Sequence, residues 1–463
     1  MTQTALRTFH LLVFLILLSL PLALVPVVRT MNPPVHSKEL AARVLLALTL
    51  VAAVAAWPRR DRRPPDLAEA GLVAVFLAAV LSAALSGRFA YCLLETWHLW
   101  VLPLLALAIM RSGASPPFLD KCALVIVSAG IVAGLYGSSV YFGFDVLNPL
   151  FPFAVENVDA RNYIHSFQGN PEYYGSYIAP VAVLALSRVF VPGLHGVRRA
   201  IWAVITVFLL FTLVLSGTRG ALGGFALGAA ILVVHGIGTL RGSARTAAAG
   251  AVGVLAVAAV GLFAILSFPN PLNVRDMRLA RRFMELFDVR SDSVKERILF
   301  YSVASRMIAA NPVFGSGPGT FRLEFYPEVE RLVESDPGVG AARMAIHLRG
   351  RIARHAHNDY LETWSTMGTL GFGALLLVLA TALVRYFRRL PMPASADAAI
   401  WGLRLNRTAF FAAGTALFLN AAFSFPLQIP DRATLAWGLL GLFFTADRLA
   451  RKSVSPASGI ESA

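Results

Sequence analysis

The sequence predicts an all-α membrane protein that crosses the bilayer about twelve times. Three observations lead to this class. Of the 463 residues, 57% are hydrophobic and only 14% are charged, against about 25% charged residues in a soluble domain. The mean hydropathy is +0.66. The apolar residues are gathered into runs close to the roughly 20 residues that a helix needs to cross a bilayer core.

The runs can be followed in order along the chain. Each is interpreted as a helix, because a backbone group without a hydrogen bond is costly in lipid. They cover residues 9–28, 40–57, 67–86, 90–110, 122–142, 175–191, 200–216, 220–236, 246–268, 360–385, 408–424 and 433–450. The first run is expected to remain as a span rather than a removed signal peptide, because no small-residue cleavage site follows it.

Two segments between the runs are too long to be simple connectors, 143–174 and 269–359. The second is predicted to be a partly helical unit outside the membrane. It contains an amphipathic helix at 293–309, with Val294, Ile298, Tyr301 and Ile308 on its apolar side, followed by a turn. The predicted parts of the chain are therefore 1–268 with nine spans, 269–359 as the extramembrane unit, 360–450 with three spans, and a tail at 451–463.

The basic residues indicate the orientation of the spans. With the N-terminus in the cytoplasm, Lys and Arg in the inner short loops outnumber those in the outer ones by roughly three to one, as the positive-inside rule expects. Lys38 and Arg432 fall in outer loops. Both termini are then cytoplasmic, and both long segments lie outside. The formal net charge of +15 is a topology signal, so no nucleic-acid partner is expected.

Missing motifs disfavour several classes of function. The chain has no Walker lysine motif, no HExxH and no GxSxG, so nothing implies a nucleotide or zinc. The glycine-rich stretch 315–319 is interpreted as a tight turn, because no strand precedes it. Cys92 and Cys122 lie at or inside apolar runs, which argues against a disulfide or zinc site. The outer acidic residues form no DxD pair, so we expect no metal and no cofactor.

Four groups of polar residues at the outer membrane boundary are candidates for chemistry. They are Arg161 with the stretch 168–171, Arg219 in the turn 216–220, Arg297 on the amphipathic helix, and the stretch 354–362 with its two histidines. Each group has a simpler interpretation, because arginines near helix ends often reach the interface and Asn358 is suited to cap a helix. Arg219 is the exception, because an ionisable residue at membrane depth is a functional hypothesis by default.

The order and spacing of these groups resemble the O-antigen ligase / O-antigen polymerase superfamily. The resemblance covers 161–371, roughly the central half of the chain. The matching stretches are 357–362 with 367–371 (HNxYLE…GxxG), Arg297 with 311–317 (RxxxW…xPxxGxG), 216–220 (SxSRG), and Arg161 with 169–171 (R…G…NPN). The sequence departs from the family at Tyr301 in place of tryptophan, Thr218 in place of serine and Glu172 in place of asparagine.

The resemblance implies a metal-independent, inverting glycosyltransferase of GT-C-like architecture in the bacterial inner membrane. Its active site would lie on the periplasmic face. The donor would be a glycan on undecaprenyl pyrophosphate, and the acceptor would be the lipid A–core of lipopolysaccharide. The polymerase and the protein O-oligosaccharyltransferase of the same superfamily share this donor, so they stay open as alternatives. A transporter or flippase is the alternative from another class, although no inverted repeat is evident.

The resemblance also suggests roles for individual residues. Without a metal, arginines must neutralise the pyrophosphate, and their planar fork suits phosphate oxygens. The attacking sugar hydroxyl needs a base, and a neutral histidine fits near pH 7. The expected pyrophosphate-binding residues are Arg161, Arg219 and Arg297, the expected base is His357 with His355 as the backup, and the supporting residues are Asn170, Asn358 and Tyr360. Contacts with the acceptor are expected within 322–354.

Overall fold

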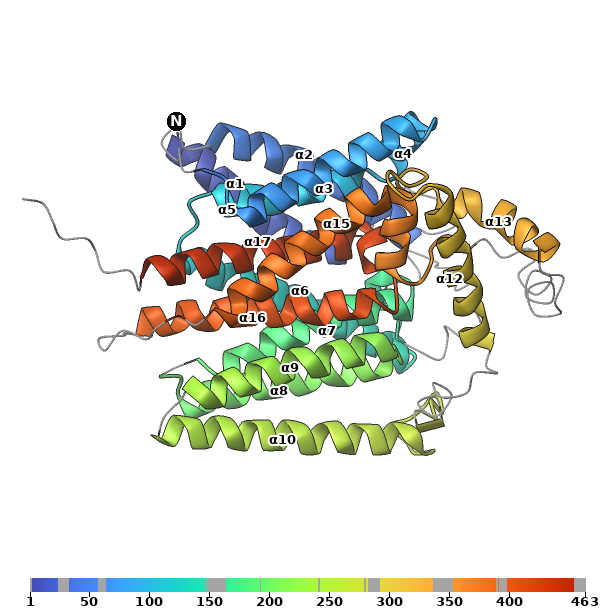
Figure 1. Cartoon of the computed structure of the whole chain (residues 1–463). Helices are drawn as coiled ribbons and strands as arrows, with labels where there is room; N and C mark the ends of the chain where they lie inside the picture. The colour runs from blue at the N-terminus through green and yellow to red at the C-terminus, as the bar shows by residue number, and fades with distance from the viewer. Residues whose placement is uncertain are drawn as a thin grey trace, which may run out of the picture.

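The computed structural model is a bundle of helices (Figure 1) with no strand among the residues that it describes. These residues are 2–23, 33–56, 64–145, 147, 164–191, 193–239, 242–278, 280–281, 292–335, 353–388, 390 and 398–453. Within them, six helices are long and apolar enough to cross a membrane, or seven if a bent pair counts as one span. A helical membrane protein with several spans is thus supported, while the number twelve stays a prediction.

Each predicted run coincides with a helix or a helix pair. The helices are α1 (Thr2–Ser19), α2 (Pro33–Ala56), α3 (Leu67–Leu85), α4 (Phe89–Glu95), α5 (Trp97–Arg111), α6 (Pro116–Tyr141), α7 (Pro171–Val189), α8 (Gly196–Leu215), α9 (Arg219–Thr239), α10 (Gly242–Ser267), α12 (Asp292–Ala310), α13 (Phe321–Ser335), α15 (Asp359–Phe387), α16 (Ala398–Ala421) and α17 (Pro430–Lys452). The run 90–110 corresponds to α4 and α5 together, which meet at a 56° bend and form either a broken span or a re-entrant loop.

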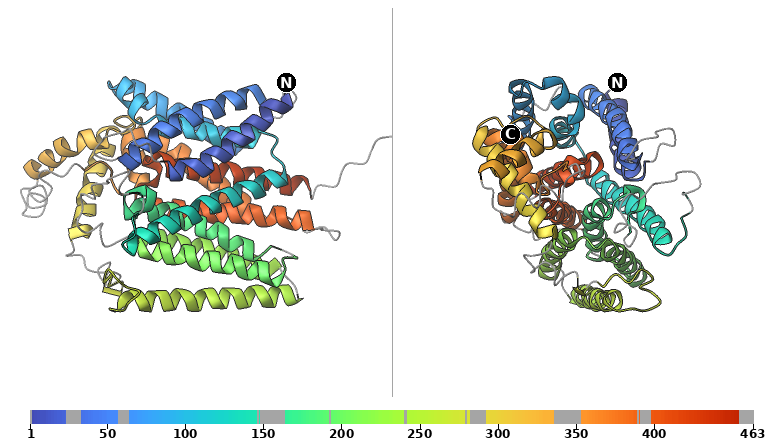
Figure 2. Two further views of the ribbon diagram at one scale, coloured as in Figure 1. Left: turned by 180° about the vertical axis from the view of Figure 1, so that it is seen from behind. Right: turned by 90° about the vertical axis from the view of Figure 1, so that its right-hand side faces the viewer.

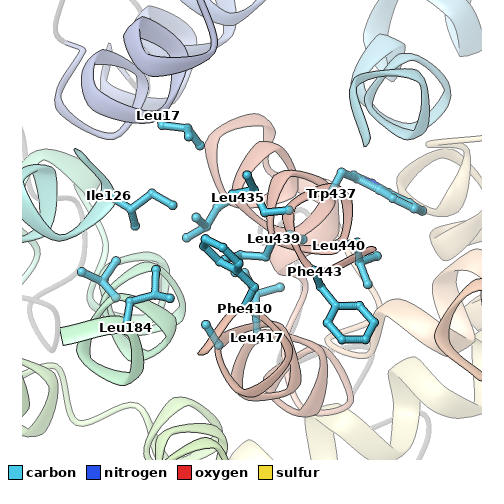
Figure 3. Close-up of a cluster of buried hydrophobic side chains, with 14 of the residues drawn as sticks. Leu17, Ile126, Leu184, Phe410, Leu417, Leu435, Trp437, Leu439, Leu440 and Phe443 are labelled. Atoms are coloured by element: carbon cyan, nitrogen blue, oxygen red, sulfur yellow. The ribbon is translucent and has the colours of Figure 1, made fainter. Parts of the chain in front are cut away.

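Helices α7, α16 and α17 form the centre of the bundle. Figure 3 shows Phe410 and Leu417 of α16 near Leu439 of α17, with Leu184 of α7 beside them, and all four side chains are fully buried. Outer helices carry exposed apolar side chains, such as Val54 on α2, which is 74% exposed. An apolar outer surface around a packed interior is what a lipid environment requires.

The helix predicted at 293–309 is confirmed as α12. Its predicted apolar side is wrong, because Ile298 is 52% exposed and the buried side chains are Leu299, Phe300, Val303, Ala304 and Met307. Helices α12 and α13 lie at one end of the bundle, and both ends of the described chain lie at the opposite end (Figures 1 and 2). We call the end with α12 and α13 the loop end.

Two basic residues that the sequence assigned to outer loops lie inside helices and are buried. Lys38 of α2 and Arg432 of α17 are each 1% exposed. Lys38 donates its Nζ to a carbonyl of the segment 164–170 at 2.7 Å, and Arg432 donates to the Gln168 side chain at 3.0 Å. A buried cation needs such acceptors, so this part of the predicted outer loop 143–174 packs inside the protein.

Helix α15 is interrupted at Gly368, and the turn after α12 fills the interruption. Gly368 has a φ of +66°. The Thr369 N–H donates to the Pro312 carbonyl at 2.9 Å, and the Gly317 N–H donates to the Thr366 carbonyl at 2.8 Å. These bonds satisfy backbone groups that a broken helix would leave unpaired. The predicted glycine-rich turn is confirmed, and it ties α12 to α15.

We expect Gly368→Ala to destabilise this junction. The new Cβ would lie 2.2 Å from the carbonyl oxygen of Val313, and a left-handed backbone already costs an alanine roughly 1–2 kcal/mol. The expected result is a loss of about 2 kcal/mol or more in the free energy of unfolding, measured as a lower Tm. Gly373→Ala in the same helix is the matched control, because open space surrounds that glycine. Equal Tm values for the two variants would contradict this account.

Candidate functional site

The candidate site lies at the loop end, where α7 and α15 begin. Asn170 caps α7, because its side chain accepts from the Glu172 N–H at 2.8 Å. Asn358 caps α15 in the same way, accepting from the N–H groups of Tyr360 and Leu361 at 3.0 and 3.1 Å. The simpler interpretation of Asn358 as a cap is thus confirmed. Helix N-termini carry partial positive charge, which favours an anionic ligand near them.

His357 immediately precedes the cap of α15 and is held between two aromatic rings. Its φ is +54°, a left-handed conformation that few residues other than glycine adopt and that is found more often at functional sites. The imidazole stacks on Phe300 of α12 with ring centroids 5.5 Å apart, and it meets Phe425 at right angles at 4.7 Å. The side chain is 31% exposed, so one part of the ring remains accessible.

The nearest carboxylate to this histidine belongs to Glu172, in the first turn of α7. The Oε1 of Glu172 lies 3.6 Å from the Nδ1 of His357, and it accepts from the Ser424 hydroxyl at 2.7 Å. Burial opposes ionisation of Glu172, but the charge of His357, the Ser424 hydroxyl and the charge of Arg297 outweigh it and lower the pKa of Glu172 to about 2. The sequence marked Glu172 only as a departure from the family pattern and missed this contact.

His355, the backup base, belongs to a separate pair. Its Nδ1 lies 3.0 Å from Glu362 Oε1, and the other oxygen of Glu362 accepts from the Ala356 N–H at 2.7 Å. Glu362 is 1% exposed. The His355 ring also stacks on Phe425, with centroids 4.5 Å apart. Two histidine–carboxylate pairs therefore share one phenylalanine.

One of the three predicted arginines lies beside this pair. Arg297 of α12 lies close enough to Glu172 to act on its ionisation. Arg219 is the first residue of α9, and the turn before it is held against α7, because the Thr218 hydroxyl donates to the Pro171 carbonyl at 3.1 Å. Arg161 lies outside the described residues. The structure thus brings Arg297 to the His357–Glu172 pair and places the start of α9 beside the start of α7.

Comparison with protein families adds independent evidence about the candidate site. Residues 204–376 match the family model of the O-antigen ligases. The resemblance seen in the sequence is thereby confirmed. No curated protein matches the chain.

The matched segment, 204–376, begins within α8 and ends within α15. It contains Arg219, Arg297 and His357. Glu172 precedes the segment, so the carboxylate that faces His357 comes from a part of the chain that the family model does not cover.

An apolar groove opens beside the end of this segment, between α15 and α16. Tyr360 lines it, and the Tyr360 hydroxyl donates to the Phe418 carbonyl at 2.7 Å. The groove has a volume of about 520 Å³. Its other lining residues are almost all apolar: Leu227, Leu376, Leu379, Ala380, Ala382, Leu383, Phe410, Phe411, Gly414, Thr415, Phe418, Leu419, Ala422, Leu440 and Phe443. Hydrocarbon is the ligand chemistry that such a surface accepts.

Among the residues that the structure describes, no group of three or more His, Cys, Asp or Glu side chains is arranged to hold a metal ion. The metal-independence of the reaction stays a prediction, which is tested below.

Proposed function

We propose that this protein transfers a glycan from undecaprenyl pyrophosphate to an acceptor at the periplasmic face of the bacterial inner membrane. In its most specific form the reaction is the ligation of O-antigen to lipid A–core. The observation that carries the proposal is that His357 and Arg297 both lie close to Glu172, where α7 and α15 begin, in a chain whose segment 204–376 matches the family model of the O-antigen ligases. In this proposal the chain crosses the membrane twelve times, with both termini in the cytoplasm and the loop end outside.

In this proposal the residues divide the chemistry between them. A hydroxyl of the acceptor sugar attacks the anomeric carbon of the donor and passes its proton to Nε2 of His357. The bond between that carbon and the phosphate oxygen breaks, and the pyrophosphate leaves with the electron pair. Arg219, Arg297 and Arg161 stabilise the charge that develops there, because their forked guanidinium groups bind phosphate oxygens in pairs. Attack opposite the leaving group gives inversion.

The apolar groove supports a donor with a long hydrocarbon chain. Gly414 lines the groove, and a side chain there would meet no atom within 4 Å. We therefore expect Gly414→Phe to fill the groove without disturbing the fold and to raise the KM for the undecaprenyl donor about tenfold, the equivalent of losing about two buried methylene groups. A donor with a short prenyl chain should be unaffected. Gly402→Phe, also in open space on α16, is the control, and equal KM values for both variants would remove the groove from the donor site.

We expect transfer to continue in excess EDTA and without ATP. The reason is that arginines and helix N-termini supply the positive charge that a divalent ion otherwise provides at a pyrophosphate. The measurement is glycan transfer by purified protein with a lipid-linked donor and acceptor. Loss of activity in chelator, with recovery on adding a divalent ion, would show that a metal is required.

One experiment separates the members of the superfamily. Lipopolysaccharide from a deletion strain is run on a gel beside the parent. If the protein is the ligase, the deletion leaves bare core while donor-linked polymer accumulates. Core carrying a single repeat would identify a polymerase, and unchanged lipopolysaccharide would point to a protein acceptor or to another class of function.

A further inference from the structure

We propose that Glu172 positions His357 for proton transfer, an inference that rests on the proposed function. Glu172 faces Nδ1 of the imidazole. A proton on Nδ1 directed at this carboxylate leaves Nε2 with its lone pair, so the contact selects the tautomer that can accept a proton from the sugar hydroxyl. The distance of 3.6 Å is longer than a hydrogen bond. Catalytic contacts are often this loose before substrate binds and tighten in the reacting complex.

Both members of the pair are held by neighbouring elements, so the juxtaposition is built into the fold. Glu172 is fixed at its backbone by the Asn170 cap and at its carboxylate by Ser424, which is 3% exposed. His357 is held by Phe300 and Phe425. These contacts come from α7, from α12 and from the connection between α16 and α17.

The charges around the pair indicate what the carboxylate of Glu172 contributes in this chain. The charged neighbours are Arg297 on α12 and Arg432 on α17, which both act on Glu172, and Arg354 on the segment that carries His357. Arg432 is itself paired with Asp431 at 3.3 Å. A site built to bind a pyrophosphate is positive, and positive charge opposes the protonation of a base. The ionised Glu172 offsets this effect and stabilises the imidazolium that forms when His357 accepts its proton.

The His355–Glu362 pair is the competing assignment. It is the closer pair, but Glu362 also accepts the Ala356 N–H. This buried carboxylate therefore fixes the backbone just before His357, and we infer a bracing role for it. A pH profile distinguishes bracing from proton transfer, because only a carboxylate that stabilises the imidazolium changes the pH at which the base becomes protonated.

The test is single-turnover transfer by the full-length protein between pH 5 and pH 9, with donor binding measured separately. We expect Glu172→Gln to lower the transfer rate by a factor of roughly 10²–10³. We also expect the acid limb of the pH–rate profile, where the rate falls as the base becomes protonated, to shift to lower pH by roughly 1–2 units. Donor binding should be no weaker, because an anion has been removed beside Arg297. Glu172→Asp should recover part of both effects. The matched control is Asp145→Asn, which removes another carboxylate that accepts from a side-chain hydroxyl, that of Tyr136 at 2.9 Å, and it should leave rate and profile unchanged.

The outcomes are distinct. A rate that falls equally at every pH, with an unmoved acid limb, would mean that Glu172 is only structural. A shifted acid limb in Glu362→Gln instead would transfer the role to His355. Either result overturns the inference.

If His357→Ala keeps the wild-type rate, the proposed base itself fails. If Glu172→Gln does not insert, Glu172→Asn provides the test, because asparagine stands at this position in the family pattern and also removes the charge. An unmoved acid limb in Glu172→Asn would overturn the inference. The double variant Glu172→Gln/His357→Ala should be no slower than His357→Ala alone, because the two residues act as a unit.

Discussion

His357→Ala is expected to slow glycan transfer by a factor of roughly 10²–10⁴, the usual contribution of a positioned acid or base. The reason is that Nε2 of this ring is the proposed proton acceptor. Donor binding should survive, because the arginines are the proposed pyrophosphate-binding residues. His355→Ala should be much milder.

The design must separate loss of the base from loss of the backbone conformation, because His357 has a φ of +54°. His357→Asn is the matched variant, since asparagine adopts the left-handed conformation more readily than alanine. Both variants should lose transfer, while only the alanine variant should also lower the Tm. A variant that transfers normally, or that merely fails to bind donor, would leave His357 as a binding residue.

The wild-type rate should fall as the pH drops from 8 to 5, because only the neutral imidazole accepts a proton. The pKa of Glu172 is lowered to about 2. This carboxylate therefore stays ionised throughout that range and adds no further pH dependence to the transfer rate. Its favourable contacts with the neighbouring cations are fully present above about pH 4.5, the ordinary range of a glutamate. They weaken only as the pH falls toward 2.

Arg219→Lys and Arg297→Lys are each expected to lower transfer by roughly 10²–10³, the effect of removing one preorganised donor from a developing negative charge. Lysine keeps the charge but loses the planar fork that binds two phosphate oxygens at once. The same direction is expected for Arg161→Lys. The measurement is transfer by protein that has inserted normally, with donor affinity measured in parallel.

The matched control for these variants is Arg278→Lys at the loop end, because Arg278 is 59% exposed and pairs only with the exposed Asp276 in the described structure. It should transfer at the wild-type rate. If the site variants behave like this control, Arg219 and Arg297 are interfacial anchors, and the pyrophosphate is bound elsewhere.

Local patterns in the sequence predicted most of the helices. Apolar runs of the right length become α1 to α10 and α15 to α17, because a helix satisfies its own backbone in lipid and this requirement is local. The helix at 293–309, the cap at Asn358 and the glycine-rich turn also depend on neighbouring residues and are confirmed. The same patterns predicted nothing about the bend between α4 and α5.

The sequence by itself determined the helical membrane class, the candidate motifs and the family to which residues 204–376 are matched. Only the tertiary structure decided which of these motifs meet. The contact between Glu172 and His357, the burial of Lys38 and Arg432, and the insertion of the turn into α15 at Gly368 join residues far apart in the chain. Hydrophobic periodicity reports the face of one helix, whereas these contacts depend on how several helices pack together, so no local pattern encodes them.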